Sequence, residues 1–343
     1  DHLDLHSFPT RRSSDLLDKS QRITALVEPL TDELGLKTDE KAAALRAAVL
    51  CKADLVSHMV VEMTSLQGIM GRYYALHSGE TSAVAEAIRE HYLPRYTGDS
   101  LPASKPGLVV GIADRLDSLV GLFAAGLAPT GTKDPFAQRR AAIGLVQLLS
   151  NFNIDFDLEK WMRIAAEKLP IEAGEKELQA CAEFISGRQR SNLIEQGYRY
   201  DVVDAVLVEQ QNNPAGALRA VKELSEWVAR DDWNLILAGY ARCVRITRDQ
   251  KETYTVDAGL FEDKSEKGLF DELLKVESSL LKPGSVDEVL TAFQPMIPAV
   301  NAFFDSVLVM AEDVRVRNNR LGLLQRISAL TDGTADLSRL EGF

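Results

Sequence analysis

The apolar residues of Gly107–Leu149 recur at helical spacing, and this pattern constrains the fold more than any other stretch of the chain. Two apolar-periodic segments are each long enough for a buried helix. The connection between them, at 128–135, is rich in turn-forming residues and cannot belong to either helix. Arg139 and Arg140 stand side by side near the start of the second segment, where positive charge opposes the helix dipole. We therefore expect an anionic partner, such as a carboxylate, beside these two arginines.

The rest of the chain shows the same periodicity, with turn signals between amphipathic segments and too few alternating runs to build a sheet. The pattern predicts an all-α protein of two helical domains. We expect the first domain at 17–151, and a helical linker with the second domain at 152–343.

Residues 4–16 read DLHSFPTRRSSDL, which is also the in-frame translation of a short-read sequencing adapter. We therefore treat 1–16 as a non-native segment and leave it out of the functional argument. On this interpretation, the natural chain was cut on its N-terminal side.

The formal net charge of −12 argues against a protein that coats nucleic acid or a membrane surface, because such binding needs positive potential. A local basic surface is compatible with this net charge. Cys51, Cys181 and Cys243 are odd in number and widely spaced, which favours reduced thiols and a cytoplasmic protein. No apolar run approaches the length of a membrane span. We expect neither DNA nor a membrane as a partner.

The sequence contains no GxGxxG, P-loop, GxSxG or HExxH motif, so no catalytic residue is assigned. Cys51-Lys52-Ala53-Asp54, followed later by Ile112-Ala113-Asp114-Arg115-Leu116, resembles the frame of the HD-domain superfamily. The resemblance matches Asp54 and Asp114 to the central and final aspartates of that frame. Ala53 stands where the metal sites of the superfamily have histidine, and two carboxylates without imidazole would hold a metal weakly. We expect a metal-free relic in which Asp114 caps a helix or pairs with a basic side chain; residual metal binding is the alternative.

Planar donors gather near the C-terminal end, at Arg317, Asn319 and Arg320. They form either a solvated face paired with Glu312 and Asp313, or a set of donors to the phosphates and base edges of a folded RNA. Other basic groups, with aromatic side chains nearby that could stack on unpaired bases, give this acidic chain a candidate basic track; they are Arg188 with Arg190, Arg219 with Lys222, and Arg242 with Arg245 and Arg248.

Four separated stretches resemble the β subunit of bacterial-type glycyl-tRNA synthetase, in the order of that family. They are KADLVSHMVVEMTSLQGIMGRYYALHSGE (52–80), EHYLPRYTGDSLP (90–102), GIADRLDSLVGLFAAGLAPTGTKDPFAQRRAA (111–142) and FFDSVLVMAEDVRVRNNRLGLL (303–324). The resemblance covers essentially 17–343 and only the C-terminal portion of that longer subunit. Met63-Thr64-Ser65 departs from the usual family residues, which bears on local packing.

The resemblance implies a heteromeric ligase whose α subunit holds the active site for glycine and uses ATP and Mg, while the β subunit binds tRNA(Gly). It implies an HD-like helical domain, then a helical anticodon-binding-type domain, in a heterotetramer or related αβ assembly. We expect no cofactor on this chain. By position, Lys133, Arg139 and Arg140 match one family motif, and Arg317, Asn319 and Arg320 match another. The candidate tRNA contacts are these six residues with Arg188, Arg190, Arg242 and Arg245.

Two other functions stay open on the sequence. One is an HD-type metal-dependent nucleotide phosphohydrolase, which the missing histidine before Asp54 disfavours. The other is a helical scaffold without affinity for RNA.

Overall fold

The structure, a computed structural model, describes residues 13–96, 98–130, 134–279 and 282–343. Lys133 lies outside the described residues. Every regular element in them is helical and no β-strand forms, which confirms the predicted all-α class. None of these helices combines the length and the apolar character needed to cross a membrane. The chain folds into two compact units, one ending at Gln189 and the other beginning at Arg190.

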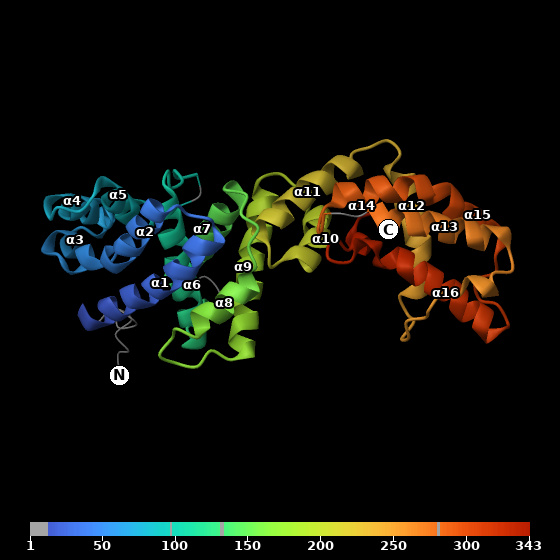
Figure 1. The fold of residues 1–343 in the computed structure, drawn as a ribbon, viewed down its shortest axis with the longest axis horizontal. Coiled ribbons are helices and arrows are strands. Elements are labelled where there is room, and N and C mark those ends of the chain that lie inside the picture. Colours follow the sequence, from blue (N-terminus) through green and yellow to red (C-terminus); the bar gives the residue numbers. More distant parts are fainter. Residues whose placement is uncertain (1–12, 97, 131–133, 280–281) are drawn as a thin grey trace. The chain divides into compact units, whose positions relative to one another are not determined.

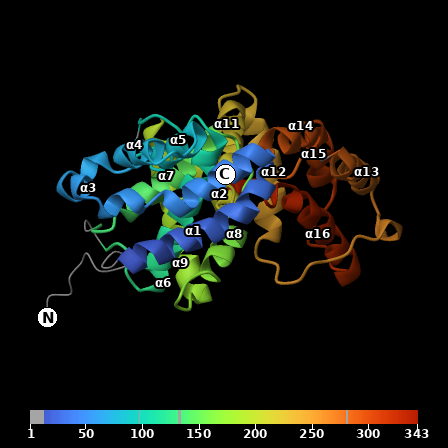
Figure 2. The same cartoon turned by 60° about the vertical axis from the view of Figure 1, so that its left-hand side comes forward.

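The first unit is arranged around one long central helix (Figure 1). Its helices are α1 (Ser13–Glu33), α2 (Thr38–Leu50), α3 (His58–Glu62), α4 (Ile69–His77), α5 (Ser82–Glu90), α6 (Lys105–Ala124), α7 (Gln138–Asn151), α8 (Leu158–Ala166) and α9 (Glu175–Glu195), the last of which continues past Gln189; 3-10 turns lie at Ala53–Val56 and Thr64–Leu66. The central helix α6 packs against α1, α2, α5, α7 and α8, and Figure 2 shows α1 and α2 side by side.

Local sequence explains how α6 begins and why it is buried. The Ser104 hydroxyl accepts a hydrogen bond from the backbone N–H of Gly107 at 3.1 Å, and Pro106 occupies the first turn, where a missing N–H costs nothing. Apolar residues then surround almost the whole helix, so it is stable only with neighbours on every side. The few polar side chains of α6 are therefore forced into the interior, where they need partners.

The second predicted helix of the opening stretch is α7. The carboxylate of Asp134 accepts hydrogen bonds from the backbone N–H groups of Gln138 and Arg139, at 2.8 and 2.9 Å. These N–H groups have no acceptor within the helix, so the carboxylate both satisfies them and complements the helix dipole. Asp134 thus places an anionic group at this helix start, bonded to the backbone, and an anionic partner for the two guanidinium groups stays a prediction.

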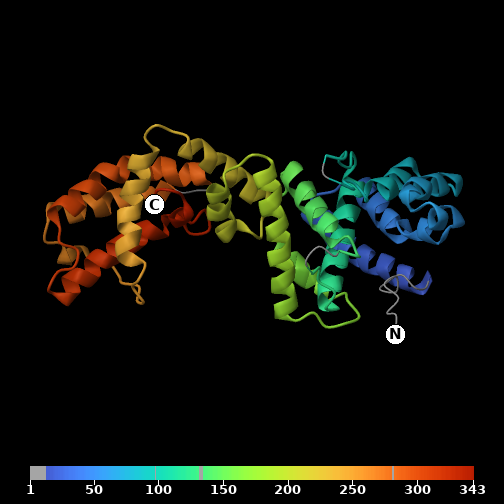
Figure 3. The same cartoon turned by 180° about the vertical axis from the view of Figure 1, so that it is seen from behind.

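The second unit is a separate helical assembly with its own core. Its helices are α10 (Tyr200–Gln210), α11 (Pro214–Val228), α12 (Trp233–Thr247), α13 (Lys264–Ser279), α14 (Val286–Phe293), α15 (Ile297–Ser306) and α16 (Val314–Ser328), with 3-10 turns at Ala258–Leu260, Gln294–Met296, Ala329–Thr331 and Leu337–Arg339. Here α12 packs against α16, α13 against α15, and α11 against α14 (Figure 3).

The two compact units divide later in the chain than the predicted domain boundary at residue 151. Trp161 and Met162 of α8 and Ile185 of α9 are buried in the core of the first unit. They lie there because α8 packs on α6, which leaves α8 and most of α9 within the first hydrophobic core.

Candidate functional site

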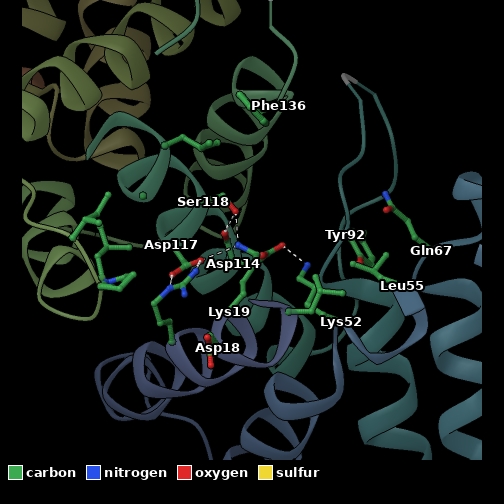
Figure 4. A pocket seen from close by; sticks show the side chains of 17 residues that line it. Asp18, Lys19, Lys52, Leu55, Gln67, Tyr92, Asp114, Asp117, Ser118 and Phe136 are labelled. Atoms are coloured by element: carbon green, nitrogen blue, oxygen red, sulfur yellow. Dashed lines mark hydrogen bonds and ion pairs between the residues drawn. The ribbon is translucent and has the colours of Figure 1, made fainter. Parts of the chain in front are cut away.

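A pocket of about 560 Å³ in the first unit has a charged floor and mostly apolar walls (Figure 4). Lys19 of α1 donates from Nζ to Asp117 Oδ2 at 2.9 Å and to Ser118 Oγ at 2.8 Å. The same ammonium group lies 3.1 Å from Asp114 Oδ1. Both acceptor carboxylates come from α6, so Lys19 ties α1 to the central helix.

Lys52, which follows α2, completes the floor of this pocket. Its Nζ donates to Asp114 Oδ2 at 2.8 Å and lies 3.0 Å from Nε2 of His91. Burial alone would raise the pKa of Asp114, but the ammonium groups of Lys52 and Lys19 hold it well below its usual range. Asp114 is therefore an ionised carboxylate held between two cations.

His91 is fully buried and held by two contacts. Its Nδ1 lies 2.7 Å from the carbonyl oxygen of Ile88, so this nitrogen carries the proton and donates it, which leaves the Nε2 lone pair to accept from Lys52. Burial, and then the charge of Lys52, lower the pKa of His91 well below its ordinary value. The imidazole is neutral at physiological pH.

Asp54 performs a different task from Asp114. Its Oδ2 accepts the backbone N–H of Gly68 at 2.7 Å and of Gly71 at 3.1 Å, at the start of α4. A Cβ at position 71 would lie only 3.0 Å from this oxygen and 2.8 Å from the side chain of Ile88, so the site requires glycine. Burial raises the pKa of Asp54. Asp54 therefore caps α4 and does not line the pocket that contains Asp114.

These residues do not fit the metal that the HD frame implies. Asp54 and Asp114 are each bonded to groups of the protein itself, and an ammonium group lies against Asp114. Among the residues that the structure describes, no group of three or more His, Cys, Asp or Glu side chains is arranged to hold a metal ion. No step of the proposed function involves a metal on this chain.

Arg115, beside Asp114, fixes the loop between α5 and α6. Its guanidinium donates at 2.9–3.2 Å to five backbone carbonyls, those of Gly111, His91, Tyr92, Leu93 and Pro94. Burial lowers its pKa to about 10. A Cβ at Gly144 would lie 2.6 Å from Arg115 Nε, so α7 needs glycine there. The stretches at 90–102, 111–116 and 139–144 thus meet in one packed joint.

The candidate arginines of the first unit lie in different surroundings. Arg140 is exposed and lines a second pocket of about 700 Å³ with Arg95 and Tyr96, and it makes no hydrogen bond or ion pair with any described residue. Arg139 is half-buried at the start of α7. The Arg188 guanidinium lies 5.7 Å from the centre of the Phe184 ring.

In the second unit, the candidate arginines differ in how far they are neutralised. Arg190 forms a two-point ion pair with Asp204, with Nη2 to Oδ2 at 2.8 Å. Arg242 donates to Asn301 at 3.0 Å and lies over the Phe304 ring. Arg245 is exposed and Arg317 is half-buried; neither side chain forms an ion pair with a described residue.

Asn319 and Arg320 are buried, with exposed fractions of 2% and 7%. The Asn319 amide accepts from the backbone N–H of Asp257 at 2.6 Å and donates to its carbonyl at 3.1 Å. Arg320 donates from Nε to Glu266 at 2.7 Å, from Nη2 to Glu262 at 2.9 Å and from Nη1 to the carbonyl of Leu308 at 3.0 Å. Both side chains tie connecting segments to α16, a geometry that favours positioning over direct contact with RNA.

Sequence reasoning did not single out Lys19, Lys52, His91 or Arg115. One signal could have pointed to them: Asp114, Asp117 and Ser118 share one face of a helix that is apolar elsewhere. Buried carboxylates at such positions need cationic partners, which other helices can supply when they pack against this face.

Comparison with known proteins gives two matches along the chain. Residues 10–208 match the family model described as "Glycyl-tRNA synthetase beta subunit", and residues 236–335 match the "DALR anticodon binding domain". The second match lies within the second compact unit. It agrees with the predicted helical anticodon-binding-type domain.

Individual relatives carry the same description. The chain is 39% identical over 337 residues to the glycine–tRNA ligase beta subunit of Moorella thermoacetica, and 40% identical over 332 residues to that of Trichlorobacter lovleyi, each covering 95% of this chain and 48% of the relative. It is 36% identical over 332 residues to glycine–tRNA ligase, chloroplastic/mitochondrial 2, of Arabidopsis thaliana, covering 96% of this chain and 31% of that relative. The chain thus spans about half the length of the bacterial relatives. Since the first family model also covers more than half of the chain, the chain belongs to the family of glycyl-tRNA synthetase β subunits.

Proposed function

We propose that this chain is a noncatalytic, tRNA-binding portion of the β subunit of a glycine–tRNA ligase. The observation that carries the proposal is the order of the two matches, a glycyl-tRNA synthetase β-subunit region followed by an anticodon-binding domain. In the proposed complex, a separate α subunit uses ATP and Mg to glycylate tRNA(Gly). The complex is a cytoplasmic heterotetramer or a related αβ assembly.

The candidate residues differ in whether their positive charge is available to RNA, and this difference assigns them different roles. The chain is acidic overall, so binding depends on local positive charge that is not already neutralised. Arg140, Arg245 and Arg317 meet this condition among the described residues. We assign them phosphate contacts, which position an RNA without reading its sequence. Asn319 and Arg320 act indirectly, by fixing the segments that they bind.

The remaining candidates take smaller parts in this proposal. Arg139 begins the helix that presents Arg140, and Arg188 lies over the Phe184 ring. Arg242 and Arg245 both lie over aromatic rings, but only Arg242 is also engaged by Asn301 and, at 4.0 Å, by Asp305. Arg190 is already paired with Asp204, which reduces its attraction for phosphate. Lys133 is assigned a phosphate contact by its position in the family motif alone.

The environment of the reactive side chains supports a noncatalytic role. Burial raises the pKa of the Cys51, Cys181 and Cys243 thiols to about 12, so the nucleophilic thiolate is scarce at neutral pH. His91 is neutral and engaged with Lys52. An acid–base or nucleophilic role would require the first core to open for Cys51, Cys181 and His91, and the second core to open for Cys243.

Reconstitution with a matching α subunit tests the proposal. A full-length β subunit carrying this region should support glycylation of tRNA(Gly), and the same subunit with Arg140, Arg245 and Arg317 all changed to alanine should show a raised KM for tRNA. An unchanged KM in the triple variant would refute the RNA role of these arginines. Glycylation at the full rate by the α subunit alone would refute the proposed role of the chain.

The two rival functions have separate readouts. A metal-dependent phosphohydrolase should release phosphate from nucleotides when Mn²⁺ is supplied, and we expect no release. A helical scaffold without RNA affinity should leave tRNA(Gly) unshifted in a gel, and we expect a shifted band.

A further inference from the structure

The ammonium group of Lys52 lies where two ligands typical of a metal site converge. Its Nζ is 2.8 Å from a carboxylate oxygen of Asp114 and 3.0 Å from the imidazole Nε2 of His91. A carboxylate oxygen and an imidazole nitrogen are the donors that zinc and other first-row divalent metals take in proteins. Lys52 therefore places one positive charge between two groups that could otherwise share a cation.

The surroundings of His91 match those of a ligand histidine. Its Nδ1–H donates to the carbonyl of Ile88 at 2.7 Å, which fixes the ring and directs the Nε2 lone pair at Lys52. Metal-ligating histidines are held by the same kind of second contact, often to a backbone carbonyl. The imidazole is fully buried, so the groups around it determine its orientation.

Asp114 is supported in a comparable way. Its second oxygen lies 3.1 Å from Nζ of Lys19, which also donates to Asp117 and Ser118. The carboxylate is thus aligned between two elements that precede α6 in the chain. Figure 4 shows Lys52 and Lys19 on either side of Asp114.

We propose that the Lys52 ammonium occupies the cation position of a degenerate metal site and holds Asp114 and His91 together without a metal ion. The proposal explains why the sequence resembles the HD frame although the described residues lack a ligand set that fits a metal. It also requires that the Lys52 side chain and a divalent cation cannot occupy the position between Asp114 and His91 at the same time. It concerns a site beyond the proposed tRNA contacts, and its failure would leave those untouched.

Replacing Lys52 with alanine should create a metal-binding site at Asp114 and His91. Zinc bonds to imidazole nitrogen and carboxylate oxygen are about 2.0–2.2 Å long. From 2.8 and 3.0 Å at present, Asp114 and His91 would each need to approach by less than about 1 Å. Water would complete the coordination. Because Lys19 stays beside Asp114, we expect binding that is measurable but weaker than in a site with three or four protein ligands.

The test is a Zn²⁺ titration of the 343-residue chain and its Lys52→Ala variant, with melting temperature as a second readout. We expect Lys52→Ala to bind one more Zn²⁺ than the parent, and Zn²⁺ to raise the melting temperature of the variant alone. Adding His91→Phe should weaken the gained binding by about tenfold or more, because the imidazole ligand is lost. Lys176→Ala is the matched control, since Lys176 is an exposed lysine of the same unit.

Three results would overturn the proposal. The first is a folded Lys52→Ala variant that binds no more Zn²⁺ than the parent. The second is gained Zn²⁺ binding that persists unchanged when His91 is also replaced. The third applies if Lys52→Ala fails to fold: Zn²⁺ should then restore folding, and failure to do so, while Lys52→Arg folds normally, counts against the proposal.

Discussion

Each of the two units buries a charged cluster, and the clusters are built with opposite signs at their centres. In the first unit, one carboxylate, that of Asp114, lies between the ammonium groups of Lys19 and Lys52. In the second, one guanidinium, that of Arg320, lies between the carboxylates of Glu262 and Glu266. The first cluster opens onto a pocket, whereas the second joins connecting segments to α16.

The contrast teaches that a polar residue in a family motif can have its partners within its own unit. Asp114, Arg115, Asn319 and Arg320 all lie in such motifs, and all have partners within their own unit. Arg317, which forms no ion pair with a described residue, stands two positions before Asn319 in the sequence. The buried residues fix the fold that presents the accessible ones.

The largest expected effect is on the cluster of the second unit. Arg320→Ala leaves the fully buried Glu266 without its cation, and breaking a buried pair in this way costs about 3–5 kcal/mol of unfolding free energy. Urea unfolding followed by Trp227 and Trp233 fluorescence in a Trp161→Phe background measures it, because Trp161 is the sole tryptophan of the first unit. A loss below about 1 kcal/mol would show that the ion pair is not what holds this unit together.

Lys52→Met should weaken the first unit by less. The variant loses the hydrogen bonds of Lys52 to Asp114 and His91, but Asp114 keeps Lys19 as a partner, so we expect a cost close to that of a charged hydrogen bond, about 1.5–3 kcal/mol. Trp161 fluorescence in a Trp227→Phe/Trp233→Phe background reports the first unit. Lys176→Met should change its stability by less than about 0.5 kcal/mol, and equal losses in the two variants would contradict the assigned role of Lys52.

Mild acid should distinguish the units through His91. Its pKa is depressed in the folded state, so the unfolded chain binds more protons below about pH 6.5 and stability falls with pH. From pH 7 to 5.5 the first unit should lose about 1 kcal/mol through His91. The second unit contains no histidine and should lack this component. His91→Phe should remove it, and an unchanged pH slope in that variant would contradict the assignment.

The smallest effect is expected for Arg140→Ala, on RNA binding and not on stability. Loss of one phosphate contact should lower the slope of log affinity against log salt by about 0.7–0.9. Arg190→Ala is the comparison, since Arg190 is already paired with Asp204 and should change the slope less. Filter binding to tRNA(Gly) over a range of KCl concentrations measures both variants. A larger change for Arg190 would reverse the ranking.

Helical periodicity was sufficient to predict the all-α class, because a helix such as α6 is apolar on nearly every face. It could not place the end of the first core. Whether α8 packs with the first core depends on the surface that α6 leaves open, and sequence spacing alone does not reveal that surface.

The charged clusters were harder to predict for a related reason. Lys52 and His91 are far apart in the sequence, and only the packing of α2, α5 and α6 brings them to 3.0 Å. Composition favoured a solvated face for Arg320 over contact with RNA, and the structure instead buries this residue against Glu266, a residue of another helix. Local pattern identifies which residues carry charge, but tertiary contacts decide which of those charges stay available.

The most direct test of the account is the salt dependence of tRNA(Gly) binding by two variants of the chain. Arg140, Arg245 and Arg317 changed together to alanine should flatten the salt slope in a folded protein. Arg320→Lys, which keeps a buried cation beside Glu266, should leave the slope of its folded fraction unchanged. The claim is that accessible arginines bind the RNA and that buried motif residues hold those arginines in place. A salt slope of the triple variant equal to that of the parent chain would contradict it, and so would a flattened salt slope in folded Arg320→Lys.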